Sequence, residues 1–315
     1  MTKETKPKPK SALVAYHDNC LDGFTSCWVT ARALQDVGYK VAVIAMKYDK
    51  DSTAGLMHSL AKYVFARLVV VDYSLELRVI AAIERVCPKT DVTILDHHKT
   101  AFERYVPHIG VEKDTKSYIE LNTGKIVLDN NESGASLCWK YFNSGKPEPK
   151  LITYVRDYDL WRFDKGLETK WVNKYLRTQS QTLARWDEMQ VRFEDPNTLS
   201  LIFDVGQQLQ AKHDEKVNDI CTEAFDVDVD GYKGRAVECD YAYVSDVGHK
   251  LAHDAGSYGL MYQLDKEAKT VKFSIRSVAH YDATVIAALY GGGGHKNAAG
   301  FTTNLAEAQS ILGRI

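Results

Sequence analysis

The chain has 315 residues, of which 45% are hydrophobic and 26% are charged, as in ordinary globular proteins. This length fits one large domain or two. The net charge of −2 gives no global attraction to nucleic acid, so a site for a polyanion must be a local focus of positive charge, such as metal ions with a few basic side chains.

No stretch reaches the roughly 18 consecutive apolar residues of a membrane span, so we expect no membrane association. Residues 1–10 have no apolar core of a signal peptide and are predicted to form a disordered, mildly basic tail. The 6 cysteines are scattered without a Cys-x-x-Cys pair, which indicates reduced thiols of a cytoplasmic protein rather than a disulfide framework.

The first half of the chain alternates short apolar runs with helical stretches. We predict helices at about 23–37, before residue 67 and at 77–86, and strands at 11–16, 40–45, 67–71 and 92–95. This order predicts an α/β domain with a mostly parallel, Rossmann-like sheet and helices on both faces. In such sheets ligands bind beyond the C-terminal ends of the strands, where His17, Asp72 and Asp96 fall.

The second half changes its pattern twice. A β-hairpin is predicted at 117–121 and 125–128, followed by helices from 133 to about 194 and one long polar helix over 197–224. Strand-like alternation then appears at 225–229, 235–239 and 271–275. We therefore predict a catalytic domain over 11–196, a linker helix over 197–224 and a smaller α+β domain over 225–315.

Four segments of the first half carry aspartates and histidines that could form one metal site. They are His17 to Asp22, Asp72, Asp96 to His98, and the pair Asp157 and Asp159. Such a mixed oxygen and nitrogen set suits Mn²⁺, or Mg²⁺ if few histidines bind. Two ions about 3.5–4 Å apart can share a carboxylate and hold the phosphoryl oxygens of a substrate. Asp72, on a central strand, is the natural bridging ligand.

Each segment also has a structural explanation. Asp72 could cap the next helix, His17 could be a hydrogen-bonded loop residue, and Asp157 could pair with Arg156 or Arg162. Three adjacent titratable groups at Asp96 to His98 are harder to explain without a shared partner such as a metal, because burying them is costly. The four segments together favour the metal site.

Two features of the last third could bind an anion. Four glycines at 291–294 precede His295 and Lys296, and such a run lets several backbone N–H groups turn toward an anion, although it could be only a flexible turn. Arg276, at the end of a predicted strand, offers a fork for a phosphate or forms an ordinary surface ion pair.

Taken together, these segments resemble the DHH phosphoesterase superfamily, in the branch that adds a DHH-associated substrate-binding domain and includes oligoribonucleases and nucleoside-bisphosphate phosphatases. The resemblance covers nearly the whole chain and is carried, in order, by YHDNCLDGF, VVVD, LDHH, RDYD, SIRS and GGGGHKNAAGF. It implies the following metal ligands: His17, Asp18, Asp22, Asp72, His97 and Asp157. It implies catalytic roles for Asp72 and for His98, which would face the scissile phosphate.

The same resemblance implies that residues of the C-terminal domain hold the substrate's phosphate or nucleotide across an interdomain cleft. These residues are Arg276, Ser277, Gly293, Gly294 and His295. The first motif departs from the commoner family pattern of two aspartates one residue apart, because Cys20 precedes the Asp22-Gly23 pair. Asp18, Asn19 and Cys20 all remain candidates for the first metal. A thiolate would shift the preference away from Mg²⁺, whereas the alternative is that Cys20 is a small buried residue.

We therefore expect a phosphoesterase that uses two Mn²⁺ ions, with Mg²⁺ as the alternative, to hydrolyse short oligonucleotides or nucleotides. No extended nucleic-acid-binding module is evident. The alternatives are a cyclic dinucleotide phosphodiesterase, a polyphosphate hydrolase and a degenerate nucleotide-binding module without activity. The oligomeric state, monomer or homodimer, stays open.

Overall fold

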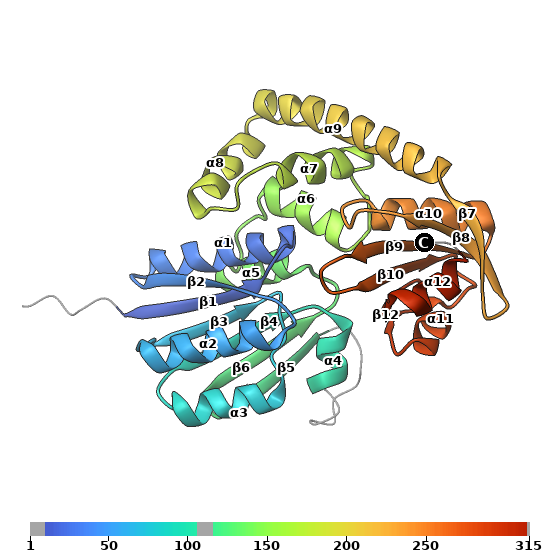
Figure 1. Cartoon of the computed structure of the whole chain (residues 1–315). Coiled ribbons are helices and arrows are strands. Elements are labelled where there is room, and N and C mark those ends of the chain that lie inside the picture. The colour runs from blue at the N-terminus through green and yellow to red at the C-terminus, as the bar shows by residue number, and fades with distance from the viewer. Residues whose placement is uncertain (1–9, 106–115, 314–315) are drawn as a thin grey trace, which may run out of the picture. The chain divides into compact units, whose positions relative to one another are not determined.

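A computed structural model describes residues 10–105 and 116–313 (Figure 1). The predicted N-terminal tail lies outside the described residues, except for Lys10. The chain divides into two compact units, Met1–Leu209 and Gln210–Ile315. Among the described helices, none is long and apolar enough to cross a membrane.

The first unit is built on a six-stranded sheet in the order β2-β1-β3-β4-β6-β5. Its strands are β1 (Ser11–His17), β2 (Lys40–Met46), β3 (Arg67–Val71), β4 (Asp91–Asp96), β5 (Lys116–Leu121) and β6 (Gly124–Asp129). All neighbouring pairs are parallel except β5 with β6, which form the predicted hairpin. The predicted mostly parallel sheet is therefore confirmed.

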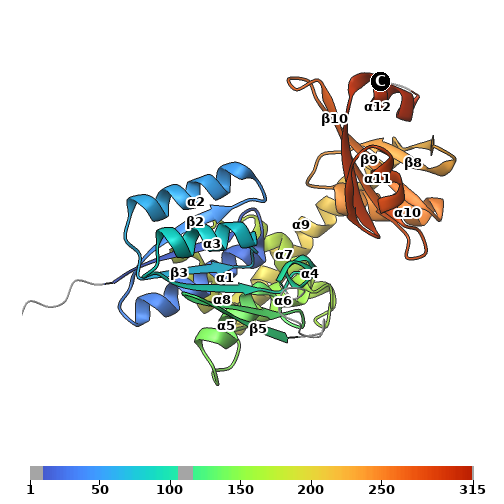
Figure 2. The same cartoon turned by 90° about the horizontal axis from the view of Figure 1, so that it is seen from below.

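Helices cover both faces of this sheet, as predicted (Figure 1). One face carries α1 (Leu21–Asp36), α5 (Gly134–Phe142), α6 (Lys150–Asp159), α7 (Leu167–Arg177) and α8 (Leu183–Glu194). The other carries α2 (Lys50–Lys62), α3 (Leu77–Val86) and α4 (Lys99–Tyr105), and Figure 2 shows α2 and α3 side by side. Along β1, Ala12 and Val14 join the first core while Leu13 and Ala15 join the second, so the strand is apolar throughout.

The strand register brings the predicted ligands to one edge of the sheet. Tyr16 pairs with Val71, and Val71 pairs with Leu95. The next residue in each strand or turn is His17, Asp72 or Asp96. The three side chains therefore follow adjacent C-terminal strand ends, as the sequence pattern indicated.

A 27-residue helix, α9 (Pro196–Thr222), matches the predicted long helix, and the division between the two units falls inside it. Its role as a linker between a catalytic and a substrate-binding domain stays a prediction.

The second unit contains a six-stranded sheet in the order β11-β12-β10-β9-β8-β7, in which β8 and β9 are parallel. Its strands are β7 (Phe225–Val229), β8 (Tyr232–Glu238), β9 (Tyr258–Asp265), β10 (Thr270–Ser277), β11 (Gly293–His295) and β12 (Ala298–Asn304). One face packs on α10 (Val244–Ala255), and the other on α11 (Ala283–Leu289) and α12 (Leu305–Leu312) (Figure 1). The predicted α+β class of this segment is confirmed.

Candidate metal centre

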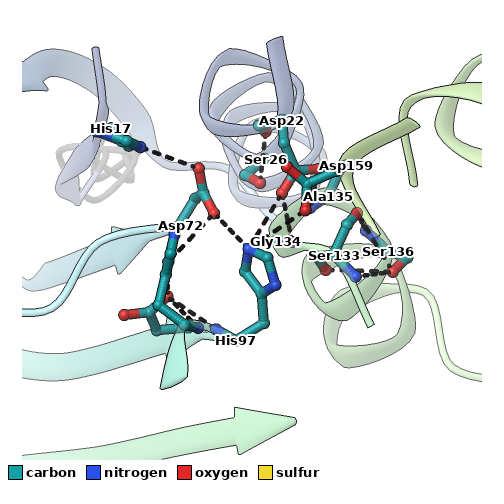
Figure 3. Close-up of polar contacts among 12 residues, drawn as sticks. His17, Asp22, Ser26, Asp72, His97, Ser133, Gly134, Ala135, Ser136 and Asp159 are labelled. Atoms are coloured by element: carbon teal, nitrogen blue, oxygen red, sulfur yellow. Dashed lines mark hydrogen bonds and ion pairs between the residues drawn. The ribbon is translucent and has the colours of Figure 1, made fainter. Parts of the chain in front are cut away.

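Asp72 lies at the middle of a cluster of histidines and carboxylates (Figure 3). It follows β3 with a φ of 54°, in the left-handed region, so the chain turns sharply where the central strand ends. Its side chain is only 1% exposed. One oxygen, Oδ1, lies 3.0 Å from His97 Nε2, and the other, Oδ2, lies 3.5 Å from His17 Nδ1. The two oxygens of one carboxylate thus serve two different histidines.

Two further carboxylates surround His97. Its Nε2 lies 3.8 Å from Asp22 Oδ2 and 3.5 Å from Asp159 Oδ2. Asp22 comes from the first turn of α1 and Asp159 from the last residue of α6, so three elements of the first unit meet at this imidazole.

The N-terminus of α5 holds Asp22 in place. Gly134 N donates to Asp22 Oδ2 at 2.5 Å and Ala135 N donates to Oδ1 at 3.0 Å. These are two of the backbone N–H groups that a helix start leaves unpaired, and the helix dipole favours an anion there. A side chain at Gly134 would place its Cβ 2.7 Å from Asp72 Oδ1 and 2.8 Å from Asp22 Oδ2, so the close approach requires glycine.

Asp96 positions His98, and its ligand atom also lies within 4.8 Å of those of Asp72, His97 and His98. Its Oδ1 lies 2.7 Å from His98 Nδ1 and also accepts from the backbone N–H groups of His97 and His98. Its Oδ2 accepts a hydrogen bond from the Ser74 hydroxyl. This network fixes the imidazole of His98 by one nitrogen.

The buried charges shift one another's proton affinities. Burial raises the pKa of Asp22 well above its usual range, and the charges of Asp159 and Asp72 add to this effect. Burial opposes ionisation of Asp72 too, but the nearby imidazole of His17 and the hydrogen bond with His97 hold its pKa below the usual range. Burial alone would lower the pKa of His97, yet the hydrogen bond with Asp72 and the nearby carboxylates raise it to about 10. In the metal-free protein the raised pKa values of Asp22 and His97 therefore favour a bound proton within this cluster.

The centre fits divalent cations on the basis of its unsatisfied atoms. Within the described part of the chain, His17 Nδ1, Asp72 Oδ2 and Asp159 Oδ2 are buried and have no hydrogen-bond partner. Buried polar atoms are normally paired, so unpaired oxygen and nitrogen atoms among these carboxylates and imidazoles fit the coordination of a divalent cation. Ligand atoms of His17, Cys20 and Asp72 lie within 4.8 Å of one another, and so do those of Asp22, His97 and Asp159.

Cys20 is therefore beside the centre, at the turn between β1 and α1. Burial raises the pKa of its thiol well above the usual range, and the charges of Asp72 and Asp22 act in the same direction. In the absence of a cation Cys20 is a neutral thiol.

Two residues expected to bind metal make other contacts in this structure, and their role as ligands stays a prediction. Asp18 is directed to Lys47, with its Oδ2 3.6 Å from Lys47 Nζ, and is absent from the clusters of ligand atoms. Asp157 accepts hydrogen bonds from Asp164 N at 2.9 Å, from Lys165 N at 3.1 Å and from the Thr169 hydroxyl. It therefore fixes the turn between α6 and α7.

Asp159, two residues after Asp157, is the aspartate of this motif that lies near His97. Residues two apart on a helix point about 200° away from each other, so only one of the two aspartates can face the centre. The sequence motif contains both and does not distinguish them.

The expected substrate-binding residues all lie in the second unit. Arg276 donates to Ile275 O at 2.9 Å and to Ser245 Oγ at 3.2 Å. Ser277 Oγ lies 2.9 Å from Tyr281 O and is buried. The last two glycines of the run lie in β11, which pairs with β12. The approach is close, because Cβ atoms at Gly292 and Gly294 would lie 2.2 and 2.5 Å from carbonyl oxygens of β12. A Cβ at Gly293 would meet nothing within 4 Å, so this glycine borders open space.

Comparison with known proteins supports the fold. No protein-family model matches the sequence. An uncharacterized protein of Acanthamoeba polyphaga mimivirus, R106, is 24% identical over 304 residues, covering 93% of this chain and 68% of R106. The structure of a manganese-bound exonuclease RecJ is similar, with a TM-score of 0.52 and 14% identity over 96% of this chain and 88% of that one. RecJ from Thermus thermophilus, in complex with Mn²⁺, gives a TM-score of 0.51 at 15% identity over 96% of this chain.

This chain spans half the length of the Thermus thermophilus RecJ chain. At these identities the likeness is one of fold, and the fold is that of the RecJ structures.

Proposed function

We propose that this protein is a metal-dependent phosphoesterase that hydrolyses short oligonucleotides or nucleotides with two divalent ions. The observation that carries the proposal is the position of Asp72, whose two oxygens face His17 on one side and His97 on the other. One ion would be held by His17 and Asp72, and the second by Asp22, Asp72, His97 and Asp159. A set rich in carboxylates with some imidazole suits Mn²⁺, with Mg²⁺ as the alternative.

Two ions held by these residues would supply an activated water molecule and would neutralise charge on the phosphoryl oxygens. His98 would supply a hydrogen-bond donor for the substrate. Asp96 holds its Nδ1, which leaves Nε2 for the substrate. Burial opposes its charge, but the hydrogen bond with Asp96 raises the pKa of His98 to about 9. The imidazolium present at neutral pH can donate a hydrogen bond to a phosphoryl oxygen and stabilise the negative charge that develops in the transition state.

A groove beside the centre favours a nucleotide over polyphosphate. Its volume is about 580 Å³, within the range of small-molecule sites. It is lined by Tyr48 and Tyr73, whose ring centroids lie 4.4 Å apart in a stacked arrangement. Charged residues of both signs also line it: Lys50, Arg78, Arg104, Asp49 and Glu76. Tyr48 also lies with its ring centroid 5.5 Å from that of His17, so the groove begins at the centre. Nucleobases stack on aromatic rings, whereas polyphosphate has no ring to stack.

The proposal keeps Arg276, Ser277 and Gly293–His295 as the residues that bind the substrate's phosphate. Arg276 supports this role because burial lowers the pKa of its guanidinium, and a partly desolvated arginine binds a dianion more strongly. A cytoplasmic location also belongs to the proposal, since all six cysteines are free.

The decisive test is a product time course on labelled RNAs of two to ten nucleotides with Mn²⁺. We expect Mn²⁺-dependent release of mononucleotides, fastest from the shortest species. Asp72→Asn should lower kcat/KM by more than about 100-fold, the size typical of losing one group that stabilises the transition state. Asp51→Asn, an exposed position in α2, is the matched control and should leave turnover unchanged. Equal turnover in Asp72→Asn and the wild type would refute the two-metal reading.

A second comparison tests the substrate class. Tyr48→Leu should raise KM for dinucleotides, while Tyr48→Phe keeps the ring and should not. Hydrolysis of tripolyphosphate with no turnover of any nucleotide would establish the polyphosphate alternative, and cleavage of cyclic but not linear dinucleotides would establish the cyclic one. Nucleotide binding without turnover under any divalent ion would show a degenerate module.

A further inference from the structure

Cys20 occupies a helix-start position where cysteine is not among the usual residue types. It directly precedes α1, the position at which Ser, Thr, Asp or Asn commonly caps a helix with its side chain. The Cys20 side chain makes no full capping bond, although the backbone N–H of Gly23 lies near enough to the thiol to act against the rise in its pKa. The preceding residue, Asn19, has a φ of 56°, so the turn is set by the backbone and places the sulfur on the side of the metal centre.

The atoms around the sulfur are potential metal ligands, and some of them have no hydrogen-bond partner. The Cys20 sulfur, a ring nitrogen of His17 and a carboxylate oxygen of Asp72 all lie within 4.8 Å of one another. Among the described residues, Asp72 Oδ2 and His17 Nδ1 are buried without a hydrogen-bond partner, and the Asp72 side chain is 1% exposed. A cation touching all three residues would satisfy both orphaned atoms and give the sulfur a role.

The start of α1 is packed tightly against this space. A Cβ on Gly23 would lie 2.3 Å from the carbonyl oxygen of His17 and 3.1 Å from Asp72 Oδ2. Cys20 is therefore held by a helix start that cannot move away from the pair without losing its own packing. The surroundings are an imidazole and a carboxylate, which do not match a cysteine that acts as a small hydrophobic residue.

Two unequal sites follow from these ligands. His17, Cys20 and Asp72 offer one nitrogen, one sulfur and one oxygen, a set that suits Zn²⁺ or another thiophilic ion. The other set has three carboxylates, those of Asp22, Asp72 and Asp159, and one imidazole, His97, which suits Mn²⁺ or Mg²⁺.

We propose that the Cys20 thiolate, with His17 and Asp72, binds a thiophilic divalent cation of the Zn²⁺ class, so that the centre holds two different ions. The thiol loses its proton to solvent when the ion binds. The inference rests on the proposed two-metal centre and adds the chemical identity of one of its ions. Cys20 is then a ligand, and its presence is no sign that the centre has decayed.

The test is a Co²⁺ titration of the metal-free full-length protein, because thiolate coordination to Co²⁺ gives a charge-transfer absorption in the near ultraviolet. We expect this absorption to saturate at one Co²⁺ per chain and to be lost in Cys20→Ser and Cys20→Asp. Cys87→Ser should keep it, since the Cys87 thiol contacts Leu60 O at 3.6 Å and is absent from the ligand clusters. No absorption in the wild type, or full absorption in Cys20→Ser, would overturn the inference.

A competition experiment measures the preference itself. After dialysis against equal concentrations of Zn²⁺ and Mn²⁺, the wild type should retain one Zn²⁺ per chain, and Cys20→Asp should shift the ratio of Zn²⁺ to Mn²⁺ by about tenfold or more toward Mn²⁺. If the variants do not fold, alkylation of the wild type followed by mass spectrometry replaces them. Zn²⁺ should then protect Cys20 and not Cys87, and equal labelling of Cys20 with and without Zn²⁺ would refute the assignment.

These readouts do not depend on turnover. Mn²⁺-dependent hydrolysis by the wild type without the Co²⁺ absorption would leave the proposed function standing and remove the role of Cys20. The absorption without hydrolysis of any phosphoester would leave the role of Cys20 standing and remove the proposed function.

Discussion

Replacing Gly134 with alanine tests whether the N-terminus of α5 must press against the metal centre. The added Cβ would lie 2.7 Å from both Cβ and Oδ1 of Asp72 and 2.8 Å from Asp22 Oδ2. Ordinary contacts between such atoms are about 3.5 Å, so the carboxylates and the helix must separate by about 0.8 Å. Neither carboxylate is the far end of a long flexible side chain, and both are buried.

The separation has two consequences. Overpacking of this kind costs about 1–3 kcal/mol of stability. It also weakens the hydrogen bonds from Gly134 and Ala135 that hold Asp22, so Mn²⁺ affinity should fall by about 10- to 100-fold, as for other losses of support around metal ligands. A displacement of this size at a reacting centre can lower turnover by about 100-fold.

The assays are calorimetric titration with Mn²⁺, urea unfolding and hydrolysis of a dinucleotide. Gly55→Ala is the matched control, because a Cβ there meets nothing within 4 Å and the residue lies within α2. That variant should gain about 0.5–1 kcal/mol of stability and keep its Mn²⁺ affinity. A folded Gly134→Ala protein that binds Mn²⁺ and turns over substrate like the wild type would refute the reasoning.

Two further predictions separate the roles of neighbouring groups. Asp159→Ala should lower Mn²⁺ affinity with little loss of stability. Asp157→Ala should lower the free energy of unfolding in urea by about 1–3 kcal/mol, because it leaves the donors at Asp164, Lys165 and Thr169 without their acceptor. The opposite pattern in paired Mn²⁺ titrations would show that Asp157 is the ligand. Mn²⁺ affinity should rise with pH from about 6.5 to 9, by up to about tenfold per pH unit. The pKa of His97 is raised to about 10 in the metal-free protein, so His97 is protonated across this range and must release its proton when the ion binds. Proton release in weakly buffered solution measures this directly, and an affinity that does not change over the range would contradict it.

Side-chain direction in the centre illustrates what local sequence cannot decide. Asp157 and Asp159 lie in one motif and carry the same group, and a helix turns them to opposite sides. Which of them faces His97 depends on how α6 is rotated in its packing against α1, α5, α7 and α8. In the same way, Asp18 and Cys20 leave the same short turn in different directions, one to Lys47 and the other to His17 and Asp72.

The sequence by itself determined the strands of the first unit and therefore the edge at which the ligands gather. Short apolar runs that alternate with helical stretches are typical of parallel strands, so His17, Asp72 and Asp96 were expected at the C-terminal strand ends. Only the tertiary structure decided which groups complete the centre. The N–H groups of α5 reach Asp22 across 112 residues of sequence, and Asp159 and Cys20 join through the rotation of one helix and the path of one turn. Those contacts depend on packing between distant elements, which no local pattern of residues records.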